Sequence, residues 1–90
     1  MFVVELAFGD DPERLAARPA HRQLLTRRHE EGTLVMAGPF PDDSGALLIF
    51  DVPDAAELHR LLDADPYFTT AGVTVVRRQE WSPIVGAPVH

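Results

Sequence analysis

Histidines are the side chains of this sequence best suited to acid–base chemistry near neutral pH, and there are four of them: His21, His29, His59 and His90. The chain has no cysteine and no lysine, which excludes thiolate nucleophiles, cysteine zinc sites and Schiff-base chemistry. It also lacks a glycine-rich phosphate loop, a nucleophile-elbow serine and an HExxH motif. A lone imidazole that takes a proton from a substrate is therefore the first chemistry to consider.

The spacing of the histidines does not predict a metal site. His21 and His29 are eight residues apart, which is about 12 Å along a helix at 1.5 Å per residue and too far to share one ion. His29 lies near the end of the predicted helix, where a cationic side chain favours the negative end of the helix dipole. His59 and His90 are expected in solvent. We therefore expect neither a metal nor a cofactor.

His21 lies where an apolar residue would be more usual. The segment ARPAHRQLL predicts a helix from about Pro19 to Glu31, with Gly32 as its stop, and His21 falls in its first turn on the core-facing stripe. The positive end of the helix dipole keeps an imidazole neutral there, and so available as a base. The alternative is a structural histidine whose ring nitrogens are both bonded within the protein.

Asp65 is a candidate for the carboxylate that assists such a base. It stands in the segment DADPYF, and a carboxylate beside a histidine fixes its tautomer and stabilises the imidazolium. The competing interpretation is that Asp65, directly before Pro66, simply ends a helix and turns the chain. The pairing requires that the fold bring both helix ends to one pocket.

The elements that would position these residues follow the order β-α-β-β-α-β, an α+β, ferredoxin-like pattern with a four-stranded antiparallel sheet and two helices on one face. Turn residues and hydrophobic periodicity separate the elements. The predicted strands are 2–8, 33–40, 45–52 and 72–81, the helices are 19–31 and 55–63, and the segment 65–72 is irregular. A short helical lead-in is expected after Asp10, Asp11 and Pro12. The buried stripe of the first helix is marked by Ala20, Leu24 and Leu25. Asp54 with Glu57 predicts a capping box for the second helix.

Two helices can cover only one face of this sheet, yet two of its strands are apolar on both faces. These apolar residues are Leu47 to Phe50 in one strand and Val73, Val75 and Val76 in the other. A second copy of the same chain is the simplest cover for the other face, so we expect a homodimer.

Composition limits the remaining possibilities. Ninety residues predict a single domain over 1–90, and the net charge of −6 repels a nucleic-acid backbone. Five arginines lie between positions 14 and 28, with Glu13, Glu30 and Glu31 beside them in the sequence, which is typical of a solvated helix face. No apolar run is long enough to span a membrane and no signal peptide is visible, so the expected location is the cytoplasm.

Five segments together resemble the YCII-related family of small proteins, in order and over nearly the whole chain. They are RPAH (18–21), EEGTLVMAGPF (30–40), GALLIFDV (45–52), ADPYFTTAGV (64–73) and EW (80–81). The resemblance implies a ferredoxin-like dimeric α/β barrel with a catalytic dyad of histidine and aspartate. By motif, the histidine is His21 and the aspartate is Asp65.

The resemblance also implies roles for residues around the dyad. Gly38 and Pro39 match a recurrent turn near the pocket, where glycine permits close backbone approach. Tyr67 would present its hydroxyl to a substrate, with packing as the alternative. The connection PDDSG is shorter than in many relatives, so the rim of the pocket differs here.

These observations predict a cofactor-free enzyme in which His21 and Asp65 perform acid–base chemistry on a small, cyclic or aromatic-derived molecule, by elimination or isomerisation. One positioned base is sufficient only where the proton is already acidic. The alternative is a non-catalytic module that binds a small ligand in the same pocket, and a cofactor-free oxygenase comes third.

Overall fold

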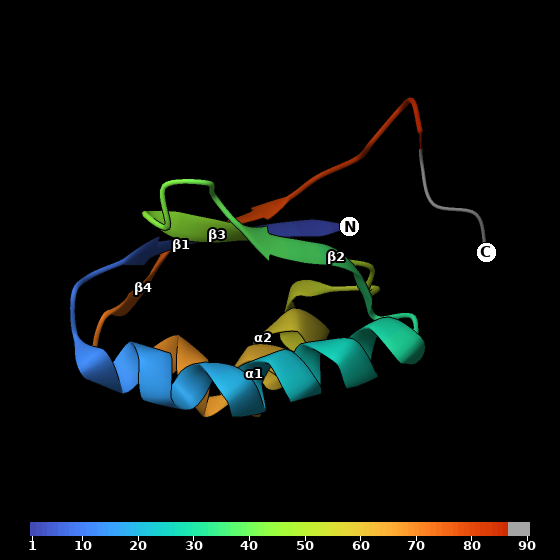
Figure 1. The fold of residues 1–90 in the computed structure, drawn as a ribbon. Coiled ribbons are helices and arrows are strands. Elements are labelled where there is room, and N and C mark those ends of the chain that lie inside the picture. Colours follow the sequence, from blue (N-terminus) through green and yellow to red (C-terminus); the bar gives the residue numbers. More distant parts are fainter. Residues whose placement is uncertain (87–90) are drawn as a thin grey trace.

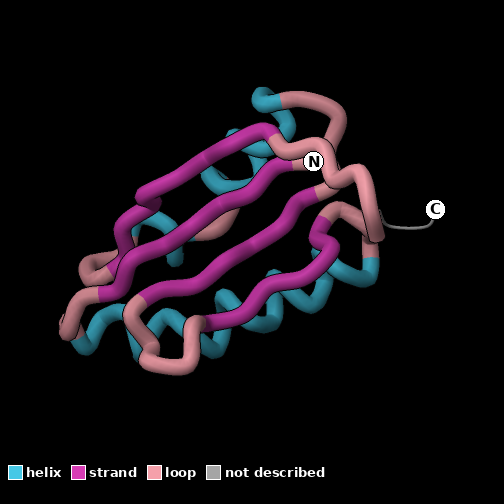
Figure 2. The backbone as a smooth tube through the Cα atoms, turned by 90° about the horizontal axis from the view of Figure 1, so that it is seen from above, coloured by secondary structure: helices cyan, strands magenta, loops and turns pink. Residues whose placement is uncertain are grey.

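A computed structural model describes residues 1–86 and shows the predicted α+β, ferredoxin-like arrangement. The sheet has the order β2-β3-β1-β4 with antiparallel neighbours, and both α-helices lie on the same side of it (Figures 1 and 2). The elements are β1 (Phe2–Phe8), α1 (Pro12–Glu30), β2 (Leu34–Pro39), β3 (Gly45–Phe50), α2 (Ala55–Asp63), the 3-10 helix η1 (Pro66–Thr69) and β4 (Val73–Glu80). The four predicted strands and the second helix are thus confirmed to within two residues at each end.

The core lies between the sheet and the helices. Alternation along β1 and β3 turns Val4, Leu6, Leu48 and Phe50 to the helical side, and these are the largest fully buried side chains. α2 adds three buried leucines, Leu58, Leu61 and Leu62, while η1 adds Tyr67 and Phe68. Burial of each large apolar side chain contributes roughly 1.5–3 kcal/mol to folding.

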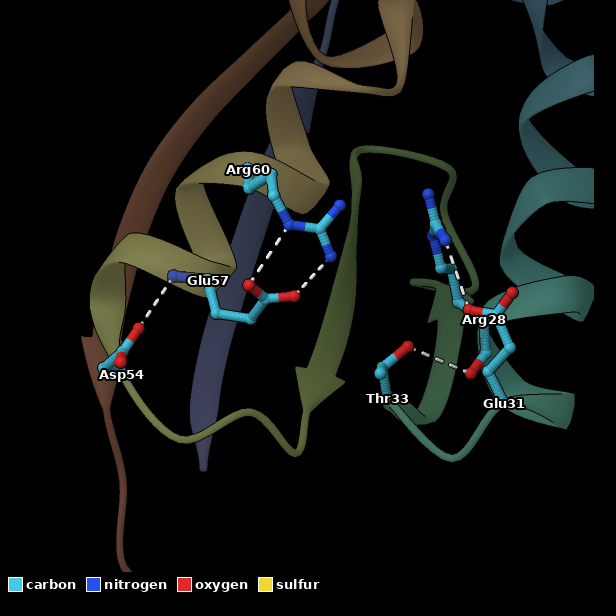
Figure 3. A network of polar contacts seen from close by, with 6 residues as sticks. All are labelled: Arg28, Glu31, Thr33, Asp54, Glu57 and Arg60. Atoms are coloured by element: carbon cyan, nitrogen blue, oxygen red, sulfur yellow. Dashed lines mark hydrogen bonds and ion pairs between the residues drawn. The ribbon is translucent and has the colours of Figure 1, made fainter.

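The start of α2 is fixed by the predicted cap. Asp54 Oδ1 accepts a hydrogen bond from the Glu57 backbone N–H at 2.8 Å (Figure 3). The Glu57 carboxylate does not turn back to complete a capping box; it pairs instead with Arg60, one turn later in the helix (Figure 3). The cap was therefore predicted correctly, and the second half of the box was not.

α1 corrects the prediction of a break at Pro19. The lead-in after Pro12 and the main helix form one continuous helix, with Pro19 in its interior. Proline lacks the N–H that would bond the carbonyl of Leu15, which is normally enough to kink or end a helix. Buried side chains on both sides of Pro19, Arg14 and His21, hold the two halves against the rest of the protein.

Two expectations about this helix are therefore wrong. His21 lies in the middle of α1, so the helix dipole at the N-terminus is no reason for a neutral imidazole. The stripe is also rotated, since Ala20 is exposed and Leu24 and Leu25 are only half-buried. The fully buried residues of α1 are polar, and this difference comes from the tertiary contacts described below.

The segment 65–72, predicted as irregular, contains the single turn of η1. Asp65 is its N-cap, because Oδ1 accepts the Tyr67 N–H at 3.0 Å, and Pro66 occupies the first turn. Gly72 follows with φ of +90°, which favours glycine, and leads directly into β4.

The face of the sheet opposite the helices carries exposed apolar side chains, as predicted. Met36 is 62% exposed, Val76 52% and Leu47 36%. Register places Leu47 and Ile49 opposite Gly38 and Met36 of β2, so these side chains share one surface. Within residues 1–86, no helix is long and apolar enough to cross a bilayer.

Candidate functional site

His21 and Asp65, 44 positions apart in the sequence, meet beneath α1. His21 Nδ1 lies 2.5 Å from Asp65 Oδ2, and the two residues are only 6% and 5% exposed. The other oxygen of Asp65 accepts the Tyr67 backbone N–H. Asp65 therefore caps η1 and binds His21 with a single carboxylate, so its local role and its pairing with His21 coexist.

The bonding pattern assigns the tautomer of His21. A carboxylate is an acceptor, so Nδ1 carries the proton in this hydrogen bond and the neutral ring keeps its lone pair on Nε2. No residue within 1–86 makes a hydrogen bond to Nε2, and His21 lines a cavity. A purely structural histidine would use both nitrogens within the protein.

Two aromatic rings fix the plane of the imidazole. Tyr67 stacks on His21 with centroids 3.9 Å apart and planes inclined by 10°, while Phe68 meets the ring edge at 5.4 Å and 90°. Tyr67 is itself only 3% exposed, and most of its ring is used in packing. The imidazole is thus held by one carboxylate and two rings.

The cavity beside His21 has a volume of about 550 Å³, within the range of small-molecule sites. It lies between α1 and the sheet and is lined mostly by apolar atoms. Gly38, Pro39 and Tyr67 line it together with His21, whereas Asp65 lies behind His21 and does not. The structure therefore brings together all five residues singled out from the sequence, four around the cavity and one behind it.

Arg14 is the residue that sequence reasoning missed. Its Nη2 lies 3.1 Å from Asp43 Oδ2, its guanidinium carbon lies 4.3 Å from the centre of the Phe8 ring, and it lines the same cavity. Burial lowers the pKa of Arg14, but the neighbouring Tyr67 hydroxyl and Asp43 carboxylate outweigh it, so the pKa is raised overall.

The expectation of a solvated arginine face is wrong for Arg14, which is 7% exposed. A signal was present, because Arg14 precedes His21 by seven residues, or about two helical turns, and so lies on the same face of a continuous helix. The assumed break at Pro19 concealed it.

The other histidines lie in simpler surroundings. His29 Nδ1 donates to the Leu34 carbonyl oxygen at 2.9 Å, near the end of α1, and His29 also lines the cavity. His59 is exposed and pairs with Asp63 at 3.0 Å, one turn later in α2. His90 lies outside the described residues. Among residues 1–86, no three metal-ligating side chains are grouped.

Comparison with known proteins gives one consistent result. The YCII-related domain matches residues 1–82. Protein YciI of Escherichia coli O6:H1 is 41% identical over 71 residues, which cover 68% of this chain and 71% of that protein. Protein YciI of Shigella flexneri matches with the same identity and coverage.

Proposed function

The chain belongs to the YCII-related domain family, and we propose that it is a cofactor-free acid–base enzyme in which His21 is the base and Asp65 its partner. The observation that supports this most directly is the buried 2.5 Å contact between His21 Nδ1 and Asp65 Oδ2, beside a cavity that His21 lines. A carboxylate bonded to Nδ1 orients the ring and stabilises the imidazolium that forms when Nε2 accepts a proton.

The proposed chemistry is elimination or isomerisation. Nε2 removes the proton from a carbon next to a carbonyl group, and the C–H electron pair moves into a new C=C bond. In an elimination the leaving group departs from the neighbouring carbon with its bonding pair. In an isomerisation the imidazolium returns the proton to another carbon of the conjugated system. A single base contributes roughly 10²–10⁴-fold, so the proton must already be acidic.

The cavity favours a small substrate with an apolar body, of cyclic or aromatic-derived type. Its volume of about 550 Å³ and its apolar lining are suited to such a molecule. Gly38 and Pro39 line the cavity from the edge strand β2, and Tyr67 lines it from η1. We assign Gly38, Pro39 and Tyr67 to substrate binding on this basis.

We also propose that the protein is a homodimer in which the exposed faces of two sheets meet, forming a dimeric α/β barrel. Met36, Leu47 and Val76 lie on this face and are at least one-third exposed. Apolar side chains gathered on one surface of a soluble chain mark an interaction site, and a second copy presents a matching apolar face. Light scattering at micromolar concentration tests this, because a stable monomer of 9.9 kDa would contradict it.

The enzymatic proposal is tested in two steps. Native mass spectrometry of the protein purified from its host identifies any retained small molecule, which then joins a panel of cyclic lactones and enolisable ketones. Incubation in D₂O reports deuterium at the activated carbon or loss of the leaving group. We expect turnover by the native protein and by His59→Gln, and none by His21→Gln.

The contrary outcome is equally defined. If a retained molecule leaves the protein chemically unchanged and binds His21→Gln as tightly as the native chain, the cavity belongs to a non-catalytic binding module.

A further inference from the structure

Arg14 is buried beside the cavity with part of its hydrogen-bonding capacity unused. Asp43 accepts one hydrogen bond from Nη2, whereas Nε and Nη1 are buried and have no partner among residues 1–86. A guanidinium carries five N–H donors and keeps its charge at all physiological pH values. Leaving such donors unpaired away from water costs free energy, and Arg14 lines the cavity, so an acceptor bound there would meet a guanidinium that the fold leaves partly unsatisfied.

The electrostatics of the cavity point to an acceptor that is an anion. Arg14, Arg18 and Arg22 recur at every fourth position of α1 and all line the cavity, and the side chains of Arg18 and Arg22 have no ion pair within residues 1–86. Asp43 is the one carboxylate among the lining residues, and its side chain is half exposed. The cavity is therefore cationic although the chain carries a net charge of −6. A cleft lined by one sign of charge concentrates ligands of the other sign.

We infer that Arg14 is the centre of a carboxylate-binding subsite, and that the cavity takes small carboxylic acids with an apolar ring. The planar guanidinium matches a carboxylate through paired N–H···O bonds, which are stronger than bonds between neutral groups. Apolar side chains that include Leu25 and Leu48 line the same cavity and suit the ring. The binding site stands independently, and only the statement that the acid is the substrate rests on the proposed function.

The relative position of Arg14 and His21 sets the length of the ligand. Seven residues along α1 separate them, which is about 10 Å at 1.5 Å per residue. A carboxylate held at Arg14 therefore places the far side of a one- or two-ring molecule near Nε2 of His21. The anion thus positions the molecule and leaves the reacting carbon at the other end.

A matched pair of probes tests the subsite without any turnover. Protein labelled with ¹⁵N is titrated with 2-naphthoate and, separately, with its uncharged isostere 2-naphthamide, while amide chemical shifts are followed by NMR. We expect naphthoate to shift the amides of Gly38 and Tyr67 and to bind at least about tenfold more tightly than naphthamide. Equal affinities, or no shift at these amides with either compound, would overturn the inference.

Three variants locate the effect. Arg14→Gln should abolish the preference for the acid, and Arg27→Gln, an exposed position on α1 that does not line the cavity, should keep it. Asp43→Asn should increase the affinity for naphthoate severalfold, because it removes the competing carboxylate, and asparagine tolerates the φ of +57° at this position. A preference for naphthoate over naphthamide that survives in Arg14→Gln would contradict the inference. A lower affinity for naphthoate in Asp43→Asn would also contradict it, and this second test does not depend on whether Arg14→Gln folds.

This outcome is separable from that of the proposed function. His21→Gln leaves Arg14 in place, so naphthoate binding should persist in it. If turnover never appears but the preference for the acid does, the enzymatic proposal is wrong and the carboxylate subsite stands.

Discussion

Residues 1–86 contain two histidine–aspartate pairs, which have the same side-chain chemistry but different surroundings. The side chains of His21 and Asp65 are 7% and 5% exposed and come from elements far apart in the sequence. The side chains of His59 and Asp63 are 62% and 65% exposed and stand one turn apart on α2. Two aromatic rings fix the first imidazole, whereas the second contacts the guanidinium of Arg78, at 3.2 Å.

The difference shows what makes a pair of ordinary side chains suitable for proton transfer. In solvent, water and salt screen the attraction, and both side chains remain free to rotate. In the buried pair, the carboxylate is itself held by the Tyr67 N–H, so its second oxygen has one direction left for the imidazole. The ring then keeps one tautomer, with its lone pair on Nε2.

The largest effect is expected from Asp65→Asn. The amide can still accept from the Tyr67 N–H through its oxygen, but it presents an NH₂ group to His21, which favours the proton on Nε2. The base is then blocked, and turnover should fall by about 10⁴-fold, as for the equivalent change in a serine-protease triad. ¹⁵N NMR of the neutral imidazole should show the Nδ1–H form in the native protein and the Nε2–H form in the variant.

Asp63→Asn is the matched control for that change. It alters the exposed pair in the same way and should leave the turnover and the tautomer of His21 as they are. An unchanged His21 tautomer in Asp65→Asn would return Asp65 to a purely structural role as the cap of η1.

Tyr67 allows the contribution of packing to be separated from that of the hydroxyl. Tyr67→Ala removes a buried ring and should destabilise the fold by about 3–5 kcal/mol, with loss of the stacking on His21. Tyr67→Phe retains the ring, so its unfolding free energy should fall by no more than about 1 kcal/mol. Denaturant unfolding of both variants measures the difference. Equal losses of unfolding free energy in the two variants would mean that the Tyr67 hydroxyl, and not the stacked ring, provides the stabilisation.

The elements with local signals were predicted from the sequence, and those that depend on distant contacts were not. The strands, the hairpin at 41–44 and the cap of α2 follow from alternation, turn residues and an Asp54 side chain that bonds three residues ahead. The start of α1 was misplaced because Pro19 breaks helices locally, whereas here Arg14 binds Asp43 in the hairpin, 29 positions away. Such a contact has no local signature.

The candidate site shows the same division. Residue chemistry selected His21 and Asp65 as candidates, and only the family resemblance predicted that they belong together. Arg14 was assigned to solvent because charged residues on a helix usually face water. Nothing in the residues near Arg14 indicates the Phe8 ring and the Asp43 carboxylate that surround it.

The smallest effect is expected from Glu57, a carboxylate on α2 whose side chain is 33% exposed and whose ion-pair partner, Arg60, is 63% exposed. The hydrogen bond from Arg60 (Figure 3) lowers the pKa of Glu57 below its ordinary value of 4.5 and outweighs the opposing effect of desolvation. A lowered folded-state pKa means that the pair stabilises the fold above pH 4.5, and that this contribution is lost as the pH falls through the lower value. Glu57→Gln should therefore leave the unfolding temperature almost unchanged at neutral pH and slightly flatten its fall in acid. Thermal unfolding from neutral to acidic pH, with and without added salt, measures this slope. A large loss of stability in Glu57→Gln at neutral pH would show that exposed ion pairs stabilise this protein as much as buried ones. Burial would then not distinguish the two histidine–aspartate pairs, and only their geometry would.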